Sequence, residues 1–290
     1  MQEARNHHFV PKLLLRPWLI EESKRQLNLW GYYWDQKRKE IACKRKGLDS
    51  FCCQIDLLSL SSHQLGRDAI ERIFFGQIDT KGAVARNALL EFGPSKLDVE
   101  QRFDFARLIV SLESRRPTSV RMLRTTANSF SDLLDTDTEV RTHFEREGID
   151  DKPSVYFEKI SGSTIEDRIL TVIQKITDSP RSYEPLLRTH WHLLRLGSGD
   201  GSFLLADRPL IRDGSIKDSS GVWALPLTPK IAFLASQNRE ALNRIERLSK
   251  FQVCRHVNIQ SALQAERFVF STETNNSKWL SKYLGPHRGR

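Results

Sequence analysis

Helix-forming patterns are concentrated between about residues 65 and 197, and this grouping restricts the fold more than any other feature. The clearest helix is expected over residues 98–115. Its apolar side chains recur every three or four residues and form one stripe: Phe105, Leu108, Ile109 and Leu112. Further helices are expected to begin near residues 69, 83 and 117 and to cover 164–177, 183–196, 238–250 and 257–265, whereas 150–157 is expected to be a loop or strand.

Strand patterns dominate the two ends of the chain. Residues 28–34 are rich in aromatic side chains, and a polar turn at 35–37 leads to a second strand at 39–43, so a β-hairpin is expected. After Gly197, short antiparallel strands are expected at 203–205, 222–225 and 231–234. Because helices are grouped and do not alternate with strands, the α+β class is favoured over βαβ units.

The predicted architecture is thus an N-terminal β-hairpin, a helical middle, and C-terminal short antiparallel strands packed with helices. We interpret residues 1–272 as a single integrated α+β domain, with a hairpin region at residues 1–60, a helical region at 65–197 and a mostly β region at 198–272. The polar residues 273–290 are expected to form a partly ordered tail. A chain of 290 residues can bury a core without disulfides or metals.

Basic residues exceed acidic ones, with 45 Lys and Arg against 36 Asp and Glu and a formal charge of +9. Such a surplus favours phosphate-rich partners. The densest basic stretch follows the aromatic strand, so Trp30, Lys37 and Arg38 are predicted to offer a stacking and phosphate-binding surface for nucleic acid. The alternative is a solvated basic surface without such a partner.

No apolar run is long enough to span a bilayer, and no apolar core of a signal peptide follows Met1, so a cytoplasmic protein without a membrane partner is expected. The four cysteines form no C-x-x-C pair and are expected to be reduced, without a zinc site. We find no Gly-rich phosphate loop, no G-x-S-x-G elbow and no complete nuclease template. His190 and His192 are expected on a helix, where they would face different ways.

Asp207 ends an apolar strand, immediately before Arg208-Pro209. A carboxylate there can be a functional group at the rim of a sheet. The alternative is a local Asx-type turn, in which its oxygens accept hydrogen bonds from the backbone N–H groups before Pro209, and the sequence favours this alternative by roughly two to one.

Three segments taken together carry a family resemblance. They are His7-His8-Phe-Val-Pro11 with Leu15-Arg16-Pro-Trp18, then Phe203-Leu-Leu-Ala-Asp207-Arg-Pro209 with Leu225-Pro-Leu-Thr-Pro229, and Val257-Asn258 with Ala265-Glu-Arg267-Phe-Val-Phe270. In order and spacing they resemble the bacterial family called domain of unknown function 4238. Ile70-Glu71 and Arg116-Pro117-Thr118 are also similar to its helical middle.

The resemblance implies a single domain, with His8, Arg16, Asp207, Asn258 and Arg267 sharing one site. It does not name a reaction. Ala206 stands where the family usually has Ser, and Arg208 where Asn is common, so the resemblance gives no support to a hydroxyl role at that turn.

Three functions remain open. The chain could act on or bind nucleic acid, for instance as a nuclease of a defence or toxin system, in which case Mg²⁺ would be an expected cofactor. It could be an interaction module without chemistry. It could also be an enzyme on a small anionic substrate, with Asp207 and His8 as acid–base groups beside Arg16 and Arg267. The oligomeric state is open.

Overall fold

A five-stranded antiparallel sheet joins the two ends of the chain in the computed structural model, which describes residues 6–23, 26–61 and 65–286. Its strands are ordered β2-β3-β11-β7, and β4 also pairs with β3. Their bounds are Ile20–Ser23 (β2), Gln26–Asp35 (β3), Glu40–Lys46 (β4), Leu205–Ala206 (β7) and Val269–Ser271 (β11). The pairing of β3 with β4 confirms the predicted N-terminal hairpin.

A second, four-stranded antiparallel sheet is ordered β6-β10-β9-β8, and we call it the central sheet. It consists of His190–Arg195 (β6), Ile211–Asp213 (β8), Val222–Thr228 (β9) and Ile231–Ser236 (β10). A separate pair joins Asn6–His8 (β1) to Cys53–Ile55 (β5). The pair places the N-terminal segment next to the first long helix.

The helices fall into three groups. The short α1 (Lys12–Leu15) and a 3₁₀ turn (η1, Arg16–Trp18) follow β1, and a π-helix (η3, Ile70–Phe75) opens the helical region. That region continues with α2 (Gly76–Phe92), α3 (Val99–Ser114), α4 (Pro117–Thr136), α5 (Thr138–Arg146), α6 (Pro153–Ser161), α7 (Ile165–Thr177) and α8 (Pro180–Leu187). The C-terminal region adds α9 (Arg239–Arg247), α10 (Lys250–Gln264) and α11 (Ser277–Leu280). Further 3₁₀ turns cover Leu48–Ser50 (η2) and Pro94–Lys96 (η4).

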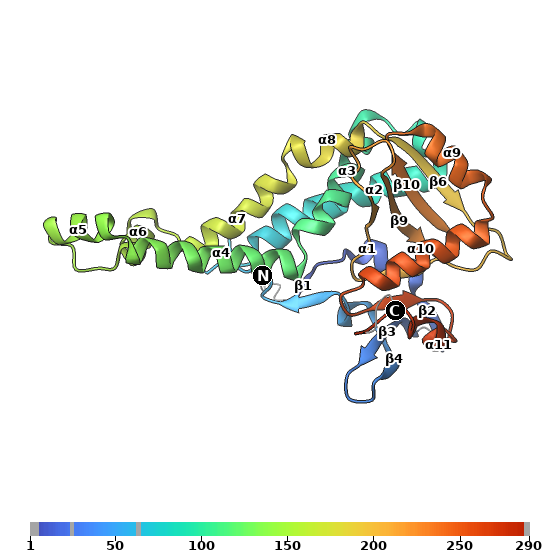
Figure 1. Ribbon diagram of the computed structural model, residues 1–290, viewed down its shortest axis with the longest axis horizontal. Coiled ribbons are helices and arrows are strands. Elements are labelled where there is room, and N and C mark those ends of the chain that lie inside the picture. Colours follow the sequence, from blue (N-terminus) through green and yellow to red (C-terminus); the bar gives the residue numbers. More distant parts are fainter. Residues whose placement is uncertain (1–5, 24–25, 62–64, 287–290) are drawn as a thin grey trace.

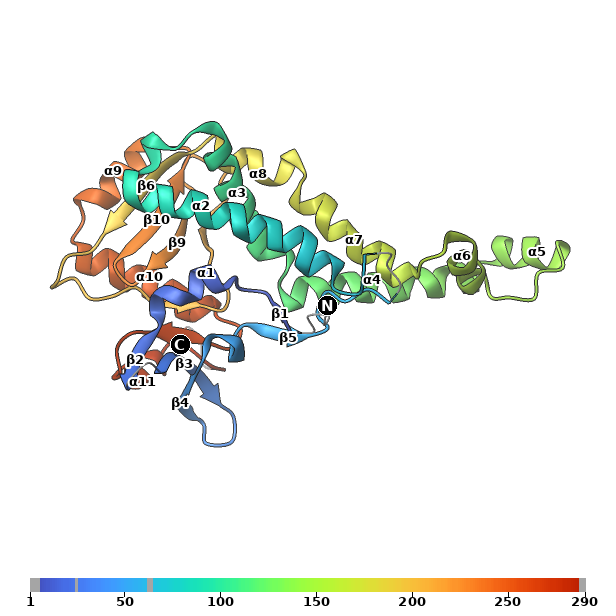
Figure 2. The same ribbon diagram turned by 180° about the vertical axis from the view of Figure 1, so that it is seen from behind.

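Helices cover both faces of the central sheet (Figures 1 and 2). Successive side chains of β10 point to opposite faces of the sheet. Phe233 and Ala235 pack with side chains of α2 and α3, whereas Ala232 and Leu234 pack with those of α9 and α10. Apolar side chains on alternate positions of one strand therefore serve two buried clusters. The observed class is α+β, as the sequence predicts.

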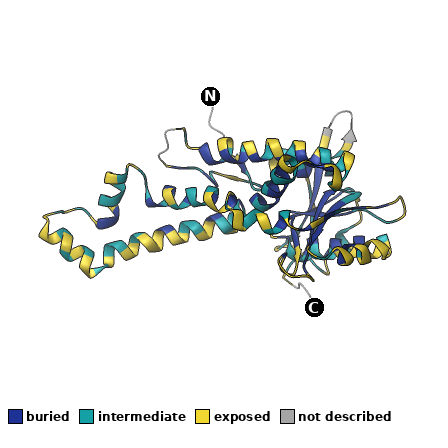
Figure 3. Ribbon diagram, turned by 90° about the horizontal axis from the view of Figure 1, so that it is seen from above, coloured by how far each residue is buried: buried dark blue, intermediate teal, exposed yellow. Residues whose placement is uncertain are grey.

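Helices α4, α5, α6 and the outer end of α7 form an arm that extends from this body (Figures 1 and 3). Few of its side chains are buried: α4 buries Val120 and Ala127, and α5 buries none of its residues. We call residues 130–163 of this region the arm tip. The arm is held at its base, where α4 packs along α7.

Three sequence predictions are wrong in the helical region. No helix begins near residue 83, because residues 76–92 form the single helix α2. Residues 183–196 were expected to form one helix, but α8 ends at Leu187 and β6 begins at His190. Leu187, Trp191 and Leu194 match a helical spacing by coincidence, since Trp191 and Leu193 alternate inward from a strand. Residues 150–157, expected as a loop or strand, contain the start of α6, with Pro153 at its first position.

His190 and His192 therefore lie on the same face of a strand and not on opposite faces of a helix. His192 Nε2 lies 2.7 Å from Glu246 on α9. No helix in residues 6–23, 26–61 and 65–286 is both long and apolar enough to cross a membrane.

Candidate functional site

A cleft of about 600 Å³ lies between the N-terminal segment and the start of the helical region. One wall comes from β1, α1 and η1, and the other from η3 and α2. The β1–β5 pair fixes the first wall, because it aligns His8 with Cys53. Ionisable side chains dominate its lining: His8, Lys12, Arg16, Glu71, Asp79 and Arg86.

His8 is held in this cleft as a neutral imidazole. Its side chain is 11% exposed, and burial lowers the pKa of the ring, with the positive charge of Lys12 adding to the effect. The backbone of Asn6 hydrogen-bonds the ring, whereas Nε2 is buried without a hydrogen-bond partner. Asp49 Oδ1 is 3.8 Å from Nε2, beyond hydrogen-bond distance. Nε2 is therefore left as an unused basic nitrogen.

Glu71 stands opposite, in the π-helix η3. Its Oε1 accepts a hydrogen bond of 3.1 Å from the His8 backbone N–H, while Oε2 is buried without a hydrogen-bond partner. Burial raises the pKa of Glu71 to about 7, although the nearby Arg115 guanidinium opposes this shift. Single π-helical turns inside α-helical segments are frequent at functional sites. The carboxyl is thus able to change protonation state near neutral pH.

Arg115 supplies a fixed positive charge beneath the cleft. Its guanidinium is fully buried and binds Asp79 through two hydrogen bonds of 2.7 and 3.1 Å. It also donates to Ser111 Oγ and lies 4.6 Å from the centroid of the Phe75 ring. Bidentate geometry makes this a strong pair, and it anchors the end of α3 to α2, close enough for the Arg115 charge to act on Glu71.

The rim of the cleft is basic. Arg16 is exposed, and its guanidinium forms no hydrogen bond or ion pair within the portion of the chain that the structure describes. Lys12 forms an ion pair with Asp49, and Arg86 donates to the Leu227 carbonyl while its Nε has no partner. Arg16 is therefore available to bind an anion at the mouth of the cleft.

Asp207 lies outside this cleft. It is 4% exposed, and its two oxygens accept hydrogen bonds of 2.7 to 2.9 Å from the backbone N–H groups of Glu266, Arg267 and Phe268. Burial raises the pKa of Asp207 to about 6, against the lowering effect of these N–H groups. The carboxylate thus fastens the segment after α10 to the end of β7, and its partners are not the neighbouring N–H groups before Pro209 that the turn alternative expects.

The remaining residues of the expected shared site line two other cavities. Asn258 lines one beside Cys254 and Trp279, and its amide ties α10 to the loop before β7: Oδ1 accepts from Leu204 N–H and Nδ2 donates to the Ser202 carbonyl. Arg267 is exposed in a third cavity. Of the five residues, the structure brings together His8 and Arg16, and it leaves Asp207, Asn258 and Arg267 apart from them.

The expected aromatic and basic surface of Trp30, Lys37 and Arg38 is present only in part. Trp30 is 8% exposed, and the Arg45 guanidinium covers its ring at 4.4 Å from the ring centroid. The Trp30 ring is therefore not free to stack on a base. Lys37 and Arg38 are exposed at the hairpin turn.

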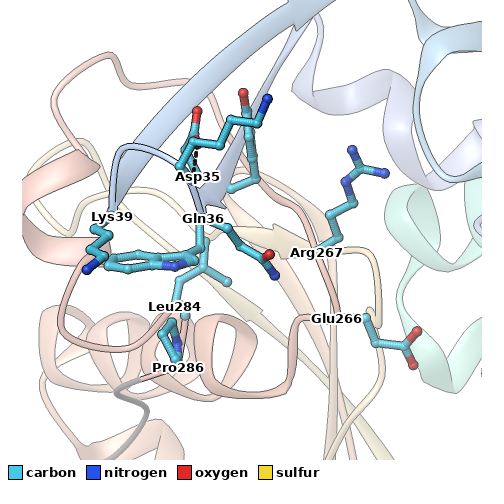
Figure 4. Close-up of a pocket in the computed structure, with 11 residues that line it drawn as sticks. Asp35, Gln36, Lys39, Glu266, Arg267, Leu284 and Pro286 are labelled. Atoms are coloured by element: carbon cyan, nitrogen blue, oxygen red, sulfur yellow. Dashed lines mark hydrogen bonds between the residues drawn. The ribbon is translucent and has the colours of Figure 1, made fainter.

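Lys37, but not Arg38, lines the third cavity, a groove of about 1320 Å³ between the hairpin and the C-terminal segment (Figure 4). We call it the hairpin groove. Its lining includes Tyr33, Trp34, Lys37, Lys39, Arg267, Leu284 and Pro286.

We next searched the described residues for clusters of metal-ligating side chains. Across residues 6–23, 26–61 and 65–286, no group of three or more His, Cys, Asp or Glu side chains could hold a metal ion. The four cysteines are free thiols, two of them buried.

Sequence patterns mark Glu71 merely as a member of the pair Ile70-Glu71 in the family resemblance, and they do not mark Asp79. A signal for Glu71 does exist, because it is a single carboxylate inside the apolar run Ala69–Phe75. Asp79 joins the site through the three-dimensional packing of α2 on α3, which no local pattern encodes.

Fold and cleft together define the class: an α+β protein with a helical arm and a cleft lined by ionisable side chains. Residues 6–275 match the family described as "Protein of unknown function (DUF4238)", and the chain belongs to that family. No curated protein and no solved structure matches the chain.

Proposed function

We propose that this protein is an acid–base enzyme that acts on a phosphate-bearing substrate in the cleft of His8 and Glu71. The observation that carries the proposal is that His8 Nε2 and Glu71 Oε2 are both buried at one cleft without hydrogen-bond partners. A buried polar atom without a hydrogen bond lowers the stability of the fold, and such atoms are commonly found at functional sites.

The two groups have complementary protonation states. The ring donates a hydrogen bond to the Asn6 backbone, which fixes the imidazole proton on the other ring nitrogen, so Nε2 is a base. Glu71, with a pKa of about 7, is protonated below neutral pH and can donate a proton to a leaving group. Arg16 would bind the anionic group of the substrate. Neither catalytic atom is exposed to solvent, so substrate entry requires rim side chains to move aside.

Nucleic acid is the second candidate substrate, since its backbone carries the same phosphate chemistry. The formal charge of +9 and the exposed Lys37 and Arg38 at the hairpin turn favour it. The proposed cleavage uses His8 and Glu71 for proton transfer.

The test is turnover of p-nitrophenyl phosphate, bis(p-nitrophenyl) phosphate, single-stranded RNA and duplex DNA from pH 4 to 9. We expect a bell-shaped profile that falls on the alkaline side at about pH 7, where Glu71 loses its proton. Glu71→Gln and His8→Gln should each lower kcat by a factor of about 10²–10⁴. Arg16→Ala should mainly raise KM.

Matched controls lie outside the cleft. His192→Gln changes a half-exposed histidine on β6, and Arg121→Ala removes an exposed arginine on α4. Both should leave turnover unchanged. The proposal fails if none of the four substrates is turned over, or if the cleft and control variants behave alike.

A further inference from the structure

The arm tip, residues 130–163, is acidic in a basic protein. It contains four Lys and Arg against nine Asp and Glu, whereas the whole chain carries +9. It also exposes large apolar side chains, with exposed fractions of 42 to 68%: Phe130, Leu133 and Ile160. An exposed apolar surface flanked by one sign of charge is typical of a surface that binds a partner.

The hairpin groove carries an excess of positive charge beside a small apolar lining. Lys37, Lys39 and Arg267 outnumber the two carboxylates of the lining, Asp35 and Glu266, and Glu266 already forms an ion pair with Arg116. Trp34 and Pro286 contribute apolar surface, whereas Leu284 is buried beneath them (Figure 4). Lys37 and Arg267 form no ion pair with another described residue. The groove thus offers unpaired cations beside apolar side chains, which is what an acidic amphipathic helix requires.

We propose that the arm tip of one copy of this chain docks in the hairpin groove of a second copy. The arm extends away from the body that carries its own groove (Figures 1 and 3), so the two surfaces meet between copies. Packing two arm tips together would oppose like charges, and two basic hairpins would do the same. Arm-to-groove contact pairs opposite charges, and a two-fold axis lets each copy give one arm and receive the other.

Sedimentation equilibrium across 1–100 µM protein measures the association directly. We expect a dimer at 50 mM salt whose dissociation constant rises at least tenfold at 500 mM salt, because the contact is electrostatic. Ile160→Glu on the arm tip, and the double change Lys37→Glu with Lys39→Glu in the groove, should each weaken the dimer at least tenfold. Val99→Glu, on the most exposed apolar side chain of α3, should not.

Mixing the variants tests which surfaces meet. The groove-variant chain keeps an intact arm and the Ile160→Glu chain keeps an intact groove, so their mixture should form a heterodimer through one contact. Circular dichroism of each variant confirms folding, which the exposure of the changed side chains favours. A monomer at 100 µM overturns the proposal. A groove occupied by single-stranded RNA in a protein that stays monomeric also overturns it.

Discussion

The body and the arm of this molecule are stabilised in different ways. In the body, side chains from both faces of the central sheet enter buried clusters with α2, α3, α9 and α10. The outer arm has no such core, and its helices are held by caps and surface ion pairs, such as Lys159 with Asp151 and the Asp137 cap of α5. Surface pairs contribute little each, so the arm belongs to the low-stability region of the structure.

If the body is one cooperative unit, the largest loss should follow from Asp207→Ala. The change leaves three backbone N–H groups of the segment after α10 without their acceptor. We expect a loss of about 4 kcal/mol in the free energy of unfolding, the order for a buried network with one partner removed. Urea denaturation measures it. Asp213→Ala, at an exposed position of β8, should cost less than about 0.5 kcal/mol, and equal losses would argue against an anchoring role for Asp207.

Glu71→Gln should act in the other direction and depend on pH. The pKa of Glu71 is about 7 in the folded protein, above its ordinary value of 4.5. The folded protein therefore has its full stability below pH 4.5, and ionisation of Glu71 removes part of that stability as pH rises through 7. Gln keeps an oxygen for the His8 N–H and does not ionise. The variant should match the parent protein at pH 4.5 and be about 3 kcal/mol more stable at pH 8.

Urea titrations of the parent protein and Glu71→Gln at both pH values give this difference. Glu100→Gln, an exposed carboxylate on α3, is the control and should show no pH-dependent gain. A Glu71→Gln variant that is equally stable at both pH values relative to the parent would remove the case for a strained carboxyl in the cleft. A gain in stability with a loss of turnover would mark Glu71 as a residue retained for function.

The parts of the fold that could be predicted from the sequence are those that a local pattern of side chains determines. The predicted helix at 98–115 matches α3 closely because its stripe faces a core. The strand β6 was missed because its apolar residues also fit a helical spacing over one short stretch. Half of the cleft residues could be predicted: His8 and Arg16 lie in motifs, but Glu71 and Asp79 reach them through packing between segments more than fifty residues apart.

Within the body, α2 packs so closely on α3 that one added methyl group should lower the free energy of unfolding, although by less than the Asp207 and Glu71 changes alter it. A Cβ at Gly82 would lie 2.9 Å from Leu108 Cβ, so Gly82→Ala forces the two helices apart. We expect a loss of about 2 kcal/mol in thermal or urea unfolding. In the same helix, a Cβ at Gly76 meets its nearest atom at 3.6 Å, and Gly76→Ala should stabilise by about 0.5–1 kcal/mol through helix propensity. Losses at both positions would mean that helix packing is not the cause.

The smallest effect should come from the arm, at the cap of α5. Asp137 accepts hydrogen bonds of 2.9 Å from the N–H groups of Glu139 and Val140, and Ala at this position removes them at a cost of about 1 kcal/mol to the helix. Because α5 buries none of its residues, that cost should fall on local opening and not on global unfolding. Amide hydrogen exchange should therefore speed up about fivefold in residues 138–146, while the urea midpoint stays unchanged. A shifted midpoint would show that the arm unfolds together with the body, and the distinction between the two regions would no longer hold.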